Sequence, residues 1–151
     1  MVQMKSALGG IPVARAMLTE FRTLSPQDML RHAIELILSG SQQDFPVVED
    51  GRVVGILTQS DLLVSLAQRG QDSLVSAVMR REFEIVDDAE MLETAFGRFQ
   101  TCQCHTLPVL RRGALVGLVT MGNVGEFVAI QAALETSRRA GPGQNTAIRN
   151  E

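Results

Sequence analysis

The chain has 151 residues, of which 45% are hydrophobic and 21% charged, and its formal net charge is −3. This composition is typical of a globular domain, and the acidic balance and the absence of Trp and Tyr disfavour a nucleic-acid-binding surface. The sequence contains no apolar run of the roughly 18 residues that a membrane span needs, and the first ten residues lack the apolar stretch of a secretory signal. A cytoplasmic location is therefore expected, and two Cys residues fit a reducing compartment better than a disulfide scaffold.

The chain contains an internal repeat. When the sequence is displaced by 62 positions, 14 of the 56 residues of Val13–Gln68 are identical to their counterparts in Val75–Ile130. The chain is therefore predicted to be two copies of one unit, over residues 11–70 and 73–137. The identical pairs include Met17 and Met79, Pro46-Val47 and Pro108-Val109, Gly55 and Gly117, and Thr58 and Thr120.

Each copy is predicted to contain a helix, a strand, a helix, two strands and a closing helix. The signals are helical apolar spacing, capping residues, and a Gly-containing turn between two apolar runs. In the first copy we expect strands at Phe21–Leu24, Phe45–Glu49 and Val53–Leu57. The helices are expected at Ile11–Met17, between Ser25-Pro26 and Gly40, and at Gln59–Gln68. In the second copy we expect strands at Phe83–Val86, Leu107–Leu110 and Leu115–Val119. The helices are expected at Ser73–Met79, after Asp87-Asp88, and at Met121–Ser137.

The last residues differ from the rest of the chain. The segment 138–151 is polar, contains Gly-Pro-Gly and shows no periodicity, which predicts a disordered tail. The predicted fold class is α/β of the α+β kind, with a small sheet flanked by helices in each unit.

The junction between the second hairpin strand and the closing helix carries the most informative motif. It reads Gly55-Ile-Leu-Thr-Gln-Ser-Asp61, and its counterpart is Gly117-Leu-Val-Thr-Met-Gly-Asn123. Free amides at a helix start favour an anion, and a nearby carboxylate can accept hydrogen bonds from a ribose diol. The same Thr-x-x-Asp spacing is also a capping box, which stabilises a helix by about 1 kcal/mol without any ligand. The pattern thus predicts either a ribose-phosphate site or a helix cap.

On these residues the unit resembles a CBS domain, and the pair resembles a Bateman module, over roughly Ile11 to Leu134. The family signature, Gly-apolar-x-Thr-x-x-Asp after a hairpin led by Pro-Val, is complete in the first copy, and the second departs from it at Asn123. The resemblance implies two units that pack sheet to sheet about a pseudo-twofold axis and leave two clefts. It also implies a regulatory, non-enzymatic module that senses AMP, ADP, ATP or S-adenosylmethionine. Such modules pair into flat dimers through their closing helices, so we expect a homodimer, with the apolar face around Phe127 and Ile130 as its contact.

The resemblance also implies ligand-binding positions. One cleft would use Thr58, Ser60 and Asp61, with the base against the Thr19–Phe21 segment and Phe45, Pro46 and Val47. The second would use Thr120 and Asn123 with Arg81, Phe83, His105, Leu107 and Pro108. Because Asn lacks the charge of Asp, the second site is expected to be weaker. Arg81 is the first choice for binding a phosphate, ahead of Arg80 and of Arg15, Arg22 and Arg52.

The Cys102-Gln-Cys104-His105 segment has too few ligands for a zinc site, so we predict no metal and no cofactor, and we expect the cysteines to be small buried residues with free thiols. No catalytic residues are predicted. Three alternatives stay open: a dimerisation module with empty clefts, an enzyme, and the regulatory part of a larger catalytic, transport or membrane protein. For the last, Phe21–Leu24 and Gly40–Val47 are similar to tails of site-2-type zinc metalloproteases, although the catalytic His-Glu-x-x-His is absent.

Overall fold

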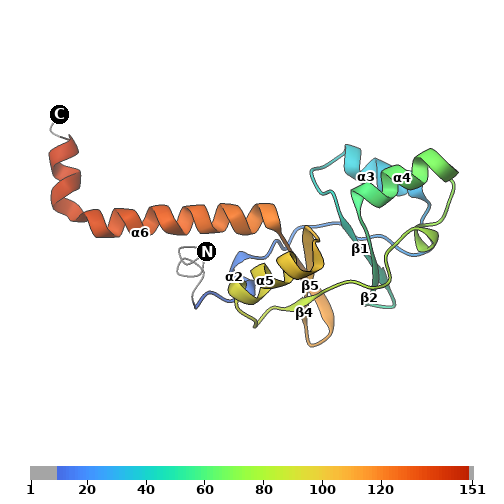
Figure 1. Cartoon of the computed structure of the whole chain (residues 1–151), viewed down its shortest axis with the longest axis horizontal. Helices are drawn as coiled ribbons and strands as arrows, with labels where there is room; N and C mark the ends of the chain where they lie inside the picture. The colour runs from blue at the N-terminus through green and yellow to red at the C-terminus, as the bar shows by residue number, and fades with distance from the viewer. Residues whose placement is uncertain (1–9, 150–151) are drawn as a thin grey trace.

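The computed structural model describes the backbone of residues 10–149 and the side chains of residues 10–139. It confirms the expected class: helices surround two small sheets, and a long C-terminal helix extends away from the body they form (Figure 1). The elements are α2 (Val13–Ala16), α3 (Leu30–Leu38), β1 (Phe45–Glu49), β2 (Arg52–Leu57), α4 (Gln59–Arg69), the 3₁₀ helix η1 (Val75–Ala77), β3 (Val86–Asp87), α5 (Leu92–Cys102), β4 (Thr106–Arg111), β5 (Ala114–Thr120) and α6 (Met121–Arg149).

The two hairpins are equivalent in detail. Strand β1 pairs antiparallel with β2, and β4 pairs antiparallel with β5. Both turn residues of each hairpin, Asp50-Gly51 and Arg112-Gly113, have positive φ angles, as expected for a type I′ turn. The register shifts between Val47 and Val48 in the first hairpin and at the matching step in the second. We call the β1–β2 hairpin with α3 and α4 unit 1, and strands β3 to β5 with α5 and the start of α6 unit 2.

The leading segment of each repeat packs against the other unit. Ile11, Val13 and Ala16, in and before α2, belong to the hydrophobic core of unit 2. Val75 and Met79, from η1 and the residues after it, belong to the core of unit 1. Each core is therefore built from both sequence repeats, and a cut between the repeats would remove part of each.

Backbone hydrogen bonds fix this exchange. The Leu18 amide donates to the Leu118 carbonyl at 2.7 Å, and the Leu118 amide donates back to the Leu18 carbonyl at 2.9 Å. At the equivalent place, the Ile56 amide donates to the Arg80 carbonyl at 3.0 Å and the Arg80 amide donates back at 2.8 Å. The leading segments thus add one short rung to the edge of β5 and of β2.

The crossing segments explain the glycine of the motif. A Cβ atom on Gly55 would lie 2.7 Å from Met79 Sδ and 2.9 Å from the Arg80 carbonyl oxygen. The same atom on Gly117 would lie 2.7 Å from Met17 Sδ and 2.9 Å from the Leu18 carbonyl oxygen. The methionine end can move, but the carbonyl is held by the rung, so only glycine leaves room for the crossing.

Two predicted helix starts are wrong. Helix α3 begins at Leu30, with Met29 as its N-cap, rather than at Ser25-Pro26, and α5 begins at Leu92 rather than after Asp87-Asp88. Residues Ser25 to Asp28 form a turn instead, in which the Ser25 amide donates to Asp28 Oδ2 at 2.8 Å. The carbonyls of Pro26 and Asp28 accept from the amides of Ser76 and Val75. The capping residues therefore shape a turn that binds η1.

The C-terminal prediction is also wrong over the described residues. Helix α6 does not end at Ser137 but continues through Arg149, where we expected disorder over residues 138–151; residues 150 and 151 lie outside the described part. Glu135 forms ion pairs with Arg138 at 2.9 Å and Arg139 at 3.9 Å, and such i,i+3 and i,i+4 pairs stabilise a helix. The helix bends near its C-terminal end (Figure 1), and its last part contains Gly141-Pro142-Gly143, in which the proline lacks a backbone donor. Within the described residues, no helix is long and apolar enough to cross a membrane.

We expect Gly55→Ala and Gly117→Ala each to lower the free energy of unfolding by about 1–3 kcal/mol, because the added methyl group overpacks the crossing. Gly97→Ala is the control: it lies within α5, has nothing within 4 Å of an added Cβ, and should stabilise the protein by about 0.5–1 kcal/mol. Urea denaturation of the three variants measures this. Equal effects of Gly55→Ala and Gly97→Ala would show that the crossing is not tight.

Candidate functional site: two clefts between the units

Two clefts lie where the units meet. Their volumes are about 420 Å³ and about 510 Å³, which is the size of small-molecule sites. Cleft 1 is lined by residues 43–44, 56, 58–60, 80, 82–84 and 102–106. Cleft 2 is lined by residues 18, 20–21, 41–44, 105–106, 118, 120–123 and 126.

The clefts share a wall in which two repeat-equivalent residues meet. Thr106 is 7% exposed, and its Oγ1 donates to Asp44 Oδ2 at 2.9 Å. The other carboxylate oxygen of Asp44 accepts from the Gln59 amide, at the first residue of α4, at 3.2 Å. This carboxylate therefore links β4 of unit 2 to the start of α4 in unit 1.

The structure groups the predicted residues differently from the sequence expectation. Cleft 1 brings Thr58 and Ser60 together with Phe83, whereas we expected Phe83 in the other cleft. Cleft 2 brings Thr120 and Asn123 together with Phe21, which we expected beside Thr58. The physical reason is the exchange of leading segments, which carries each Phe across to the other unit's helix start. His105 lines both clefts.

Several predicted residues line neither cleft. Phe45, Val47 and Leu107 are core residues, Pro46 and Pro108 are buried, and Thr19 is exposed outside both clefts. Arg81 points away, since its Nη2 donates to the Ser76 carbonyl oxygen at 2.9 Å. The neighbouring residue Arg80 lines cleft 1 in its place.

Asp61 lies behind Arg80 rather than in the cleft wall. Arg80 Nε donates to Asp61 Oδ2 at 2.6 Å, and Arg80 Nη2 donates to Asp61 Oδ1 at 3.3 Å. The hydrogen bond from Arg80 lowers the pKa of Asp61, although partial burial opposes this shift, and the charge of Arg80 adds to it. The carboxylate therefore stays ionised at neutral pH and orients the guanidinium.

The capping interpretation of the motif is geometrically present. Thr58 is the N-cap of α4, and its Oγ1 accepts from the Asp61 amide at 3.1 Å. The Asp61 side chain is used elsewhere, on Arg80, so the cap occupies the threonine hydroxyl and leaves the carboxylate available for the guanidinium.

In the second copy, Asn123 makes one contact that an ionised aspartate could not, because its side-chain amide also donates a hydrogen bond. Its Oδ1 accepts from the Thr120 amide at 2.6 Å, and its Nδ2 donates to the Ala16 carbonyl oxygen at 2.5 Å. Ala16 ends α2, so the amide attaches the exchanged helix to unit 2. Leu18 occupies the position equivalent to Arg80, so the charged pair Asp61–Arg80 beside the start of α4 corresponds to the neutral pair Asn123 and Leu18 beside the start of α6.

The clefts consequently differ in charge. Cleft 1 has Arg80 at its helix start, with Asp44, Glu82 and Glu84 also in its wall. Cleft 2 has three carboxylates, from Glu20, Asp44 and Glu126, and no Lys or Arg lines it among the described residues. Arg80 was already a candidate in the sequence, but only the rung to Ile56 shows which of the two adjacent arginines faces the cleft.

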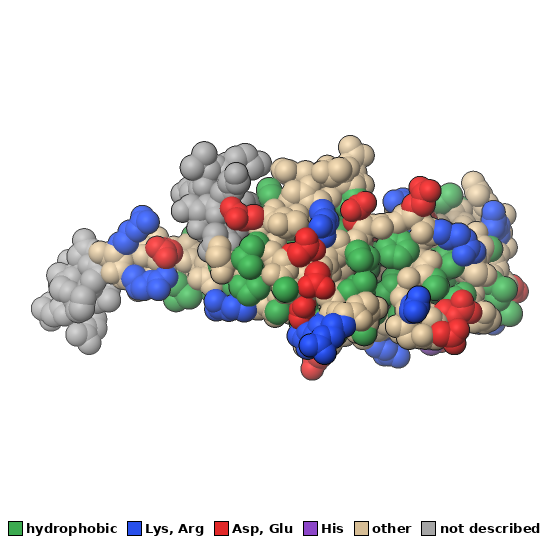
Figure 2. Space-filling model, turned by 90° about the horizontal axis from the view of Figure 1, so that it is seen from below, with side chains coloured by type: hydrophobic (Ala, Val, Ile, Leu, Met, Phe, Trp, Pro, Cys, Tyr) green, Lys and Arg blue, Asp and Glu red, His purple; other side chains and the backbone are tan. Residues whose placement is uncertain are grey.

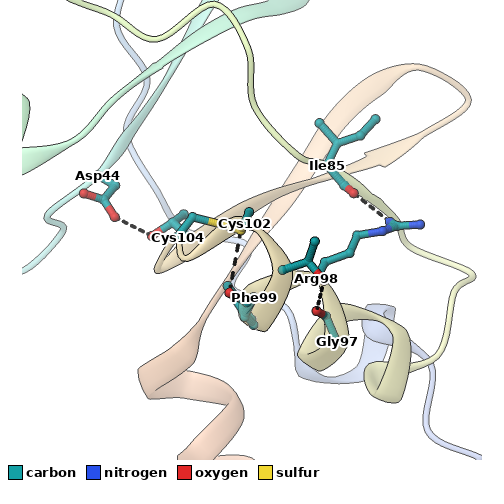
Figure 3. Close-up of a disulfide and its surroundings, with 9 residues drawn as sticks. Asp44, Ile85, Gly97, Arg98, Phe99, Cys102 and Cys104 are labelled. Carbon is teal, nitrogen blue, oxygen red and sulfur yellow. Dashed lines mark hydrogen bonds between the residues drawn. A yellow bond between two sulfur atoms is a disulfide. The ribbon is translucent and has the colours of Figure 1, made fainter.

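A disulfide joins Cys102 and Cys104 at the rim of cleft 1 (Figure 3), where free thiols were expected. The sequence expectation rested on compartment and number of cysteines, and neither reports the geometry of a Cys-x-Cys turn. Over the described residues, no group of three or more His, Cys, Asp or Glu side chains could hold a metal ion. The absence of zinc itself stays a prediction.

We expect Asn123→Asp to destabilise the protein by about 1–3 kcal/mol, because the carboxylate cannot donate to Ala16 and would face its carbonyl oxygen. Asp61→Asn is the matched variant in the other copy: it keeps the cap but loses the charge that orients Arg80, so it should cost less. Urea denaturation compares the two. If Asn123→Asp is as stable as the wild type, the bond to Ala16 contributes nothing.

Comparison with known proteins agrees with this architecture. The CBS domain model matches residues 8–68 and 75–129. YhcV, a CBS domain-containing protein of Bacillus subtilis (strain 168), is 31% identical over 114 residues, which are 74% of this chain and 81% of that protein. The crystal structure of CBSX2 in complex with AMP has a TM-score of 0.69 at 26% identity and covers 85% of this chain and 99% of its own. AcuB of Vibrio cholerae has a TM-score of 0.75 at 24% identity, over 87% and 98%. The chain therefore belongs to the CBS domain family and contains two CBS domains in tandem.

Proposed function

We propose that this protein is a regulatory module that binds an adenosine nucleotide in cleft 1. The observation that carries the proposal is the Arg80 guanidinium in the wall of cleft 1, oriented by Asp61 beside the start of α4. Arginine matches phosphate geometry, and a helix start favours an anion. The complex of CBSX2 with AMP supports the nucleotide class, because CBSX2 is 26% identical to this chain.

Different residues of cleft 1 would contact the phosphate, the ribose and the adenine of the nucleotide. Arg80 is half exposed and can donate to a phosphate while Asp61 keeps its charge balanced. The Thr58 and Ser60 hydroxyls lie next to it and suit the ribose hydroxyls. Phe83 and Ile56 supply the apolar surfaces that an adenine ring needs.

Cleft 2 favours a ligand without negative charge. A phosphate placed among Glu20, Asp44 and Glu126 would meet like charges without a lysine or arginine from the described wall to offset them. We therefore propose one AMP per chain, in cleft 1. An uncharged nucleoside or a cationic adenosyl compound such as S-adenosylmethionine is the better match to cleft 2.

We also propose that two chains associate through the closing helices. Leu63 on α4 is 59% exposed and Ile130 on α6 is 60% exposed, with Val64 and Met121 also exposed nearby in sequence. Figure 2 shows one face of the molecule, on which hydrophobic side chains lie at the surface between acidic and basic ones. A second copy would cover such side chains, and ligand binding could then act on the arrangement of the two chains.

Replacing Arg80 by leucine, the residue at the equivalent position 18, tests the nucleotide site. Arg80→Leu should weaken AMP binding by about 10-fold or more, since a hydrogen bond to a charged group contributes about 1.5–3 kcal/mol and each decade of affinity is about 1.4 kcal/mol. Adenosine, which lacks the phosphate, should bind the variant and the wild type similarly. Isothermal titration calorimetry measures both ligands.

Arg81→Leu is the control, because it removes the same charge from a side chain that bonds Ser76 outside both clefts. It should leave AMP affinity within about 2-fold. If Arg80→Leu and Arg81→Leu weaken AMP binding equally, the net positive charge of the region matters for binding, and the specific role proposed for Arg80 is wrong. If the wild type binds no adenosine compound, the proposed function is wrong.

Light scattering tests the association. We expect a particle of twice the 16.4 kDa chain at micromolar concentration, and the double variant Leu63→Asp/Ile130→Asp should shift it toward the monomer, because it places charges on the proposed contact. Asp substitutions at the solvent-exposed positions Thr94 and Gln100, both on α5, serve as a control for added surface charge. A wild-type monomer under these conditions would contradict the association.

A further inference from the structure

The disulfide lies in the connection between α5 and β4. Cys102 is the last residue of α5, Gln103 has a left-handed backbone (φ 53°, ψ 37°), and Cys104 comes just before His105 and the start of β4. Both cysteines are half-buried and pack against the unit 2 core on one side. The whole segment from Cys102 to Thr106 also lines cleft 1, so the bond is shared between the core and the cleft wall (Figure 3).

Stability does not account for this bond. A disulfide stabilises a fold mainly by closing a loop in the unfolded chain, and its effect grows with loop length. Here the cysteines are only two positions apart, so the loop is close to the shortest possible. The entropic gain is correspondingly small.

The other copy shows that the fold does not need the bond. The equivalent positions are Gly40 and Gln42, and unit 1 builds the same α-to-β connection without sulfur. There the Gln42 side chain holds the loop: its Nε2 donates to the carbonyl oxygens of Arg22 at 2.9 Å and Asp44 at 3.0 Å, and its Oε1 accepts from the Arg22 amide at 2.8 Å. Unit 2 has Cys104 in place of this glutamine, and the covalent bond to Cys102 stands where unit 1 has the Gln42 hydrogen bonds.

We propose that Cys102 and Cys104 are a reversible redox modification site whose state sets the shape of cleft 1. The reaction is thiol–disulfide exchange with a small-molecule disulfide of the glutathione type. One cysteine thiolate attacks a sulfur of that disulfide, forms a mixed disulfide and expels the first small thiolate. The second cysteine thiolate then attacks the protein sulfur of the mixed disulfide, closes the Cys102–Cys104 bond and expels the second small thiolate. The two electrons lost by the cysteines reduce the small disulfide, and the two protons they lose protonate the released thiolates.

The contacts around Cys104 connect the bond to the ligand-binding residues. When the bond breaks, the sulfurs must move from a bond length of about 2.05 Å to nonbonded contact at about 3.5 Å or more. Cys104 is two residues before Thr106, which donates to Asp44, and Asp44 accepts from the Gln59 amide at the start of α4. The disulfide form is thus the form in which the cleft wall and the helix start are held together, and it is the tighter binder of AMP; this last step rests on the proposed function.

The redox chemistry is tested on the full chain without any ligand. The protein is equilibrated in glutathione buffers of graded ratio, alkylated and weighed by mass spectrometry. We expect one transition from two alkylated cysteines to none, with half conversion inside the range of the buffers. A pair that stays fully reduced or fully oxidised throughout the series would overturn the proposal.

Hydrogen exchange tests the effect on the wall. Reduction should speed amide exchange in residues 103–106 at least 3-fold and leave residues 41 and 42, in the equivalent loop held by the Gln42 side chain, unchanged. The Cys102→Ser/Cys104→Ser variant should match the reduced protein in every buffer. Equal exchange in the two redox states would overturn the proposal.

Calorimetry with AMP then tests the coupling. We expect the reduced protein and the double serine variant to bind AMP at least 3-fold more weakly than the oxidised protein. Equal affinities in the two redox states would refute control of the cleft. If neither state binds AMP while exchange in residues 103–106 still responds, the redox site stands and the proposed nucleotide function fails.

Discussion

The structure depends on one close approach, repeated twice, of an extended segment to a glycine in the neighbouring unit. Met17-Leu18 crosses Gly117, and Met79-Arg80 crosses Gly55, each held by a pair of backbone hydrogen bonds. The crossing completes both cores at once, because the helical turn before each segment fills the core of the other unit. Each core therefore contains side chains from both sequence repeats, and neither CBS domain has its complete core without the leading segment of the other repeat.

The same crossing decides the chemistry of the clefts. It brings position 80 to the start of α4 and position 18 to the start of α6, so the side chain at each of these positions lies in the wall of the adjacent cleft. Where position 80 is Arg, the motif acid is Asp61, and the two form an ion pair. Where position 18 is Leu, the motif position is Asn123, and its amide bonds Ala16 instead. The departure from the family signature in the second copy thus occurs where leucine stands in place of arginine, and it supplies a hydrogen bond to Ala16.

Much of the fold was predictable because it depends on local or periodic signals. The repeat, the Asp50-Gly51 and Arg112-Gly113 hairpins, and the Thr58 cap all follow from spacing and turn chemistry. The sequence did not predict that Phe83 shares a cleft with Thr58 and Phe21 with Thr120. The leading segment of a repeat has the same sequence pattern whether it packs against its own unit or against the other unit. Ser25-Pro26 resembles a helix start, yet the carbonyls of Pro26 and Asp28 accept from the amides of η1, about 50 residues further along the chain, and no local pattern reports such a partner.

The pseudo-twofold relation also makes the two clefts dependent on each other. Asp44 and Thr106 are equivalent in sequence but carry different groups, a carboxylate and a hydroxyl, and therefore form a hydrogen bond that two ionised carboxylates could not form. Their bond stands in the wall of both clefts, so a ligand that displaces one partner in cleft 1 alters a wall residue of cleft 2. Any resulting coupling of affinities must be equal in both directions. An anion beside Arg80 and a neutral or cationic ligand among Glu20, Asp44 and Glu126 would then be complementary in charge, which favours joint over separate occupancy.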